Sequence, residues 1–135
     1  MELWTVADAA RCAVAELGPR RENLPGGWRC LLQLRDDYER ARRGGGLPAG
    51  AALFGNEPPS TGDRQVDAAL AALAEHLARR DGWPVPAWAF AEERYAQPWW
   101  FPAGVVSWHA MALVQSPLAF HKRGVFLTDG DLERV

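Results

Sequence analysis

Long apolar runs are missing from this chain of 135 residues, and lysine is almost missing, with Lys122 as its one example. No stretch approaches the roughly 20 consecutive apolar residues that a membrane-spanning helix needs. The two cysteines, Cys12 and Cys30, are too few for a disulfide-stabilised scaffold. The first residues lack a basic start, and charges interrupt the stretch that would be apolar in a signal peptide. These absences favour a cytoplasmic protein with no membrane association.

An excess of positive charge is also missing. The chain has 15 Lys+Arg against 17 Asp+Glu, a net charge of -2 and a pI of about 5.9. A dedicated nucleic-acid-binding domain typically has a pI above about 9, so the composition argues against that class. With 48% hydrophobic and 24% charged residues, the chain has the composition of a folded globular protein of one domain.

Helical periodicity is the main signal in the first part of the chain. Thr5 precedes apolar residues at a 3.6-residue period, and Asp8 completes a capping-box pattern with it. This predicts a helix that stops at Gly18. A second helix is predicted over residues 28–43 and is expected to end at the three glycines 44–46.

The strongest helical pattern begins at Thr61 or Asp63, either of which can cap it. Leucines follow at helical spacing, and Gly82 is the residue expected to stop the helix in a left-handed conformation. After a proline-bounded link, residues 88–95 are predicted to form a short helix.

Together these helical patterns predict a mainly α, compact helical single domain. Its parts are an N-terminal helical pair over 1–46, a Gly/Pro-rich connection over 47–62 and a C-terminal helical domain over 63–135. Residues 107–115 are expected to form the central buried helix, because they are apolar on nearly every side. One short strand-like segment is expected at 125–128. The predicted core consists of Leu70, Leu73, Leu77, Trp108, Met111, Leu113 and Val114.

Sequence signatures of catalysis are absent. Glu75-His76 is not followed by a second histidine one turn later, as a zinc-protease HExxH motif requires. The glycine-rich segment at 44–50 lacks the lysine and hydroxyl of a phosphate-binding loop, and no GxSxG turn occurs. The other histidines, His109 and His121, stand far apart in sequence. The sequence therefore assigns no catalytic residue, metal ligand or cofactor.

Two clusters are candidates for contact with a partner. Trp99, Trp100 and Phe101 lie between two prolines, and Trp88 precedes them. Such rings either fill the core or anchor a protein interface, where tryptophan is favoured. The second cluster is His121, Lys122 and Arg123, which is either a solvated helix end or a site for an anionic partner such as an acidic protein face or phosphate.

The C-terminal part resembles a known family. The matching segments are PPSTGDRQVDAALAALAEHLARRDG, PVPAW, PWWFP and SWHAMALVQSPLAFHKRGVFLTDGDLERV, within residues 58–135. They are similar to the C-terminal domain of actinobacterial XRE-type helix-turn-helix regulators and antitoxin-like proteins. The resemblance implies pairing with neighbouring nucleotidyltransferase-like proteins, as in toxin–antitoxin systems, and carries over no catalytic residues. Residues 1–46 lack a clear helix-turn-helix, because Pro19, Pro25 and the Gly26-Gly27 pair interrupt the recognition helix.

We therefore expect a non-catalytic protein-interaction module, an antitoxin-like or accessory subunit. Its aromatic cluster would fill a pocket on a protein partner encoded nearby, and its basic cluster would pair with the partner's carboxylates. One alternative is a dimeric DNA-binding transcriptional regulator, suggested by the arginine pairs 20–21, 42–43 and 79–80. A second alternative is a small enzyme that uses His109 or His121 as acid or base. Homodimer formation is left open.

Overall fold

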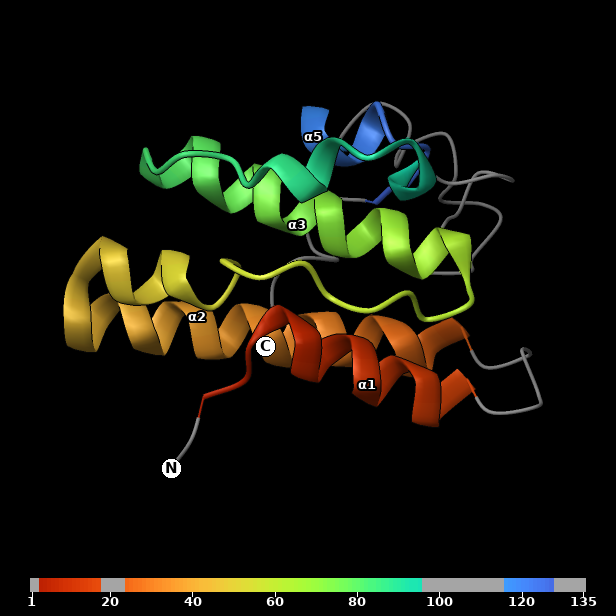
Figure 1. The fold of residues 1–135 in the computed structure, drawn as a ribbon, viewed down its shortest axis with the longest axis horizontal. Helices are drawn as coiled ribbons and strands as arrows, with labels where there is room; N and C mark the ends of the chain where they lie inside the picture. The colour runs from red at the N-terminus through yellow and green to blue at the C-terminus, as the bar shows by residue number, and fades with distance from the viewer. Residues whose placement is uncertain (1–2, 18–23, 96–115, 128–135) are drawn as a thin grey trace.

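The computed structural model describes residues 3–17, 24–95 and 116–127, which are mainly helical (Figure 1). The elements are α1 (Val6–Leu17), α2 (Leu24–Ala52), α3 (Arg64–Asp81), the 3-10 helices η1 (Ala87–Phe90) and η2 (Glu92–Arg94), and α5 (Leu118–His121). The predicted mainly α fold is confirmed. Within these ranges there is no strand, so the strand-like segment at 125–128 is not confirmed, and residue 128 lies outside them.

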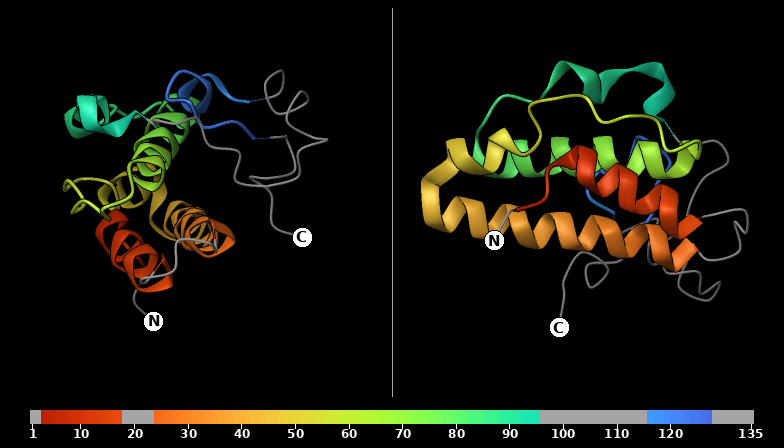
Figure 2. Two further views of the ribbon diagram at one scale, coloured as in Figure 1. Left: turned by 90° about the vertical axis from the view of Figure 1, so that its right-hand side faces the viewer. Right: turned by 60° about the horizontal axis from the view of Figure 1, so that its bottom comes forward.

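Helix α3 lies between two layers. The pair formed by α1 and α2 lies on one side of it, and η1, η2 and α5 lie on the other side (Figures 1 and 2). Twelve of the residues of α3 are buried, and six of them are alanines, which are good helix formers and let neighbours approach closely. The centre of the described fold is therefore α3, whereas residues 107–115, which were expected there, lie outside the described residues.

Both ends of α3 follow the predicted capping chemistry. The carboxylate of Asp63 accepts hydrogen bonds from the backbone N–H groups of Gln65 (2.9 Å) and Val66 (3.3 Å). At the other end Gly82 has φ 86°, and its N–H donates to the carbonyl of Ala78 at 2.8 Å. A residue with a Cβ is strained in that left-handed conformation, which is why glycine ends the helix.

Replacing the N-cap tests this account. Asp63→Ala is expected to lower the free energy of unfolding by about 1 kcal/mol, because two backbone donors lose their acceptor. Asp63→Ser, which keeps an acceptor oxygen, should stay close to the wild type. Urea unfolding followed by circular dichroism measures both variants, and equal midpoints for Asp63→Ala and the wild type would contradict the capping role.

Helix α2 extends beyond its predicted end. Gly44 and Gly45 remain helical, and the break comes at Gly46, which has φ 80° and lies outside the helical region. The chain changes direction there and continues as a helix to Ala52 (Figure 1). The connection predicted over 47–62 therefore begins as a helix, and a single glycine with positive φ makes the corner.

The corner brings the end of α2 back over Tyr38. A Cβ on Gly50 would lie 2.7 Å from Cε2 of Tyr38, so only glycine fits at this contact. The rings of Tyr38 and Phe54 lie edge to face with their centroids 5.9 Å apart, and Trp83 packs against both. This aromatic cluster joins α2 to the segment after α3.

Helix α1 begins with the predicted capping box. The N–H of Thr5 donates to the carboxylate of Asp8 at 2.9 Å, and the N–H of Asp8 donates to the hydroxyl of Thr5 at 3.3 Å. A disulfide between Cys12 and Cys30 joins α1 to α2. This pairing was not predicted from the sequence.

The core prediction is confirmed where the structure describes it. Leu70, Leu73 and Leu77 are buried, and the other four predicted core residues lie outside the described ranges. Val14 of α1, although apolar, is exposed. Among the described helices, none is long and apolar enough to cross a membrane.

Candidate functional site

The predicted aromatic anchors are only partly described. Trp88 is half-buried, and its indole N–H donates to the carbonyl of Phe54 at 3.0 Å. The guanidinium of Arg94 lies 5.3 Å from the centroid of its ring. Trp88 is therefore held within the fold by both neighbours. Trp99, Trp100 and Phe101 lie outside the described residues.

A buried ion-pair network holds the predicted basic cluster. Glu75 of α3 is 1% exposed and accepts hydrogen bonds from Arg123 (2.6 Å) on one oxygen, and from Lys122 (2.8 Å) and Arg79 (2.6 Å) on the other. Arg123 is equally buried, so its guanidinium faces Glu75 in the interior and is not at the surface to meet a partner. His121 is exposed, with its ring 5.2 Å from that of Phe126.

Arg123 also joins two short helices. Its guanidinium donates to the carbonyls of Ala89 (2.8 Å) in η1 and Ala119 (2.9 Å) in α5. Its position over the rings of Phe90 and Tyr95 adds cation–π contacts at 5.7 and 5.3 Å. A single buried side chain therefore fixes η1 and α5 beside each other over α3.

The charge of this network is unbalanced. Burial alone would raise the pKa of Glu75, but the hydrogen bonds from Lys122, Arg79 and Arg123 outweigh burial and lower that pKa to about 2. Glu75 is therefore ionised at neutral pH, and three cations surround one carboxylate. Lys122 and Arg79 are partly exposed and present this surplus of positive charge at the surface.

Two large apolar side chains are exposed beside these cations. Phe90 is 45% exposed and Leu118 is 73% exposed. The ammonium of Lys122 lies 5.4 Å from the centroid of the Phe90 ring. Leu118 is the first residue of α5 and stands one turn before Lys122, which caps the end of that helix, so the two side chains lie on the same side. We call Phe90, Leu118, Lys122 and Arg79 the Phe90–Leu118 surface.

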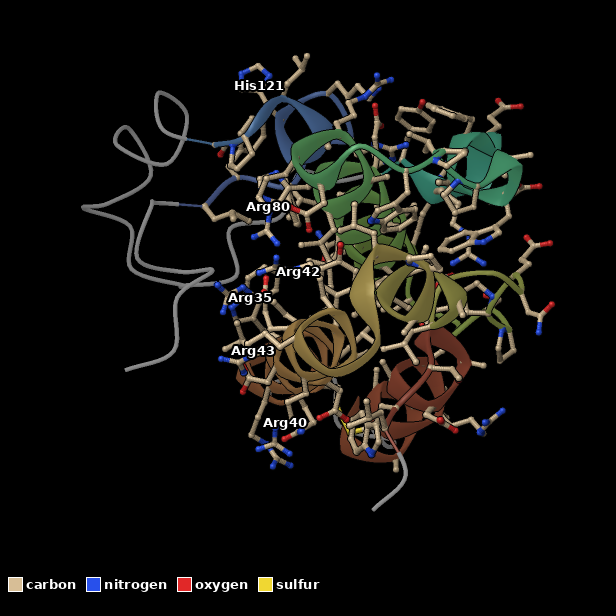
Figure 3. The ribbon with its side chains drawn as sticks, turned by 90° about the vertical axis from the view of Figure 1, so that its left-hand side faces the viewer. Arg35, Arg40, Arg42, Arg43, Arg80 and His121 are labelled. Carbon is tan, nitrogen blue, oxygen red and sulfur yellow. A yellow bond between two sulfur atoms is a disulfide. The ribbon has the colours of Figure 1, made fainter. Side chains whose placement is uncertain are left out.

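Arginines cluster on a second surface. Arg35, Arg40, Arg42 and Arg43 of α2 and Arg80 of α3 lie along one side of the molecule, with His121 beyond them (Figure 3). We call the five arginines the arginine face. Arg80 and Arg42 donate to opposite oxygens of Glu39, at 2.6 and 2.7 Å, and Arg80 also binds Asp81.

Asp81 connects the arginine face to the aromatic cluster. Its carboxylate accepts the hydroxyl of Tyr38 at 2.5 Å, and that hydroxyl accepts the indole N–H of Trp83 at 2.8 Å. Burial raises the pKa of Tyr38, and the hydrogen bond to Asp81 raises it further, to about 12. Tyr38 is therefore neutral at all physiological pH values and serves to fix the end of α3 on α2.

A pocket of about 580 Å³ lies beside η2. It is lined by Glu57, Pro58, Pro59, Ser60, Asp67, Ala91, Glu93 and Arg94. Its buried polar groups bind one another: Asp67 accepts from Ser60 (2.9 Å) and Thr61 (2.8 Å), and Arg94 donates to the carbonyl of Pro58 (2.9 Å). These hydrogen bonds fix the wall of the pocket, and Glu57 and Glu93, which also line it, are exposed.

Within the described ranges, no group of three or more His, Cys, Asp or Glu side chains has the arrangement of a metal site. His76 stands apart from other ligands; burial, and then the charges of Arg80 and Arg35, lower its pKa. No protein-family model, curated protein or solved structure matches this chain.

Sequence reasoning missed the role of Glu75. In the sequence, Glu75 stands out only as part of an incomplete zinc-binding motif. The available signal was a glutamate placed among alanines and leucines of an apolar helix, since a buried carboxylate needs cationic partners. The sequence could not identify these partners, because Arg123 follows 48 residues later.

Proposed function

We propose that this chain is a non-catalytic protein-interaction module, an antitoxin-like or accessory subunit that binds one protein partner. The observation that supports the proposal best is the Phe90–Leu118 surface. There, exposed apolar side chains lie beside a surplus of positive charge, on two short helices that a buried arginine holds in place. Exposed apolar side chains gain free energy when a partner covers them, and little entropy is lost because their helices are already fixed.

The charge of the surface indicates the chemistry of the partner. The partner would offer an apolar depression bordered by carboxylates, because Lys122 and Arg79 exceed the charge of Glu75. A nucleotidyltransferase-like toxin, which the family resemblance implies, fits this description.

A cytoplasmic location is part of the proposal. In that compartment glutathione and thioredoxin keep thiols reduced, so Cys12 and Cys30 would exist there mainly as thiols and would form the disulfide only under oxidising conditions. The proposal does not require the disulfide, because the partner surface is formed by η1, α3 and α5.

The experiment measures binding to the protein encoded next to this chain, by titration calorimetry. Phe90→Ser and Leu118→Ser should each weaken binding by about tenfold or more, the effect expected for the loss of an apolar anchor. Leu47→Ser is the matched control, since Leu47 is also an exposed apolar residue but belongs to α2. Equal affinity for all four proteins, or no binding by the wild type, would contradict the proposal.

A further inference from the structure

The arginine face presents its cations outward and its carboxylates inward. The side chain of Arg40 is 50% exposed, and those of Arg42 and Arg80 are 37% exposed. Their partners are more deeply placed: Asp37 is 4% exposed, Asp81 12% and Glu39 18%. Solvent therefore contacts more positive than negative charge on this face, although each of these three arginines has a carboxylate partner, because the guanidinium groups lie over the carboxylates.

These carboxylates also hold the arginines in place. Glu39 receives Arg42 on one oxygen and Arg80 on the other, which sets two guanidinium groups beside each other. Each guanidinium has five N–H donors, and those not turned toward Glu39 or Asp81 stay available. Fixing long side chains in advance reduces the entropy lost when a ligand binds.

Two further arginines extend the cluster along α2. Arg40 and Arg43 stand three residues apart and so lie on neighbouring positions of the helix surface. Arg43 is exposed, and Arg40 reaches Asp37 only at 4.0 Å. Arg35 contributes little net charge, because Asp36 lies 3.8 Å away and is equally exposed.

The overall net charge of -2 does not cancel this local charge. At physiological ionic strength the Debye length is about 8 Å, so acidic groups on other faces of the molecule are largely screened here. A ligand approaching α2 and the end of α3 meets the guanidinium groups of Arg40, Arg42, Arg43 and Arg80 (Figure 3). These four cations outnumber the three less exposed carboxylates beneath them, Asp37, Glu39 and Asp81.

We propose that Arg40, Arg42, Arg43 and Arg80 bind the phosphodiester backbone of a nucleic acid without reading its bases. Arginine matches phosphate with two parallel N–H donors, and a row of guanidinium groups on two helices fits a ligand with repeated charges. Arginine is also enriched at protein interfaces, so an acidic protein is the competing ligand that the test must exclude. This inference goes beyond the proposed function and concerns a different surface.

The test uses the full chain and a fluorescein-labelled 20-base-pair duplex of arbitrary sequence, with binding followed by anisotropy between 50 and 200 mM NaCl. Four phosphate contacts predict a slope of about -3.6 for log K against log salt, and a loss of affinity on the order of 100-fold over this range. A single-stranded RNA of equal length tests whether the arginines bind the backbone of a single strand as well as that of a duplex. Its slope should be smaller, at about -2.8 for the same contacts.

Arg40→Gln/Arg43→Gln is the decisive variant, because these two side chains make few contacts within the fold. Its slope on the duplex should fall to about -1.8. Arg11→Gln/Arg64→Gln removes the same charge from α1 and from the start of α3 and should keep the wild-type slope. Circular dichroism of each variant verifies that the helices are intact.

Three outcomes would overturn the inference. The first is no binding of either nucleic acid at 50 mM NaCl. The second is an equal reduction of the slope in both double variants, which would show a general charge effect. The third is competition by polyglutamate at the same charge concentration as the duplex, which would assign the arginine face to an acidic protein.

Discussion

Glu75→Leu is expected to destabilise the protein by about 3–5 kcal/mol, enough to unfold many domains of this size. The substitution leaves the guanidinium of Arg123 buried without its carboxylate. Among the residues that the structure describes, the carbonyls of Ala89 and Ala119 then remain its only hydrogen-bond acceptors. Lys122 and Arg79 suffer less, since both reach solvent. Thermal and urea unfolding followed by circular dichroism measure the loss.

A double variant separates the unpaired charge from the change of shape. Glu75→Leu/Arg123→Met replaces both partners by apolar side chains and should recover most of the lost stability, because buried pairs are often replaceable in this way. If the double variant is no more stable than Glu75→Leu, the cost comes from packing and the account of the ion pair is wrong.

The pH dependence of unfolding is a second readout of the same residue. The pKa of Glu75 is about 2 in the folded protein and close to 4.5 when the chain is unfolded. Because the folded pKa is the lower one, the stabilisation is fully present above about pH 4.5 and is lost as the pH falls toward 2. Glu75→Leu/Arg123→Met should lack this part of the acid-induced loss of stability. If the stability of this double variant depends on pH in the same way as that of the wild type, the low pKa of Glu75 is contradicted.

Reduction of the disulfide is expected to have the next largest effect. The Cys12–Cys30 bond closes a loop between cysteines 18 residues apart, and closing a loop of this size restricts the unfolded chain by about 3 kcal/mol. The bond ties α1 to α2 where Cys30 is buried, so its loss should loosen the helical pair. Urea unfolding with and without dithiothreitol measures the difference.

The Cys12→Ala/Cys30→Ala variant is the control for the reductant. Its midpoint should match that of the reduced wild type within a few tenths of a molar urea and should not change with dithiothreitol. A wild-type midpoint that is the same in both conditions would mean that the disulfide contributes nothing to stability.

The sequence alone determined the parts of this protein that depend on near neighbours. The capping box at Thr5 and Asp8, the cap at Asp63 and the stop at Gly82 all join residues within a few positions of one another. Such contacts follow from the local geometry of a helix, and the mainly α fold and the buried leucines of α3 follow from the 3.6-residue period. For the same reason the sequence predicted that the helix ends at the three glycines, whereas the structure has a corner at Gly46 and a helix that continues to Ala52.

Only the tertiary structure decided which charges are buried and which reach solvent. Glu75 binds Arg123 across 48 positions, Arg80 binds Glu39 across 41, and Tyr38 binds Asp81 across 43. These distances along the chain carry no periodicity, so a basic triplet such as His121-Lys122-Arg123 gives no sign that its last member lies inside. The packing of α5 and η1 over α3 turns Arg123 inward and leaves Phe90 and Leu118 exposed. The packing of α3 against α2 likewise brings Arg80 to Arg42. The positions of these charges depend on how whole helices pack against one another, and not on their neighbours in the sequence.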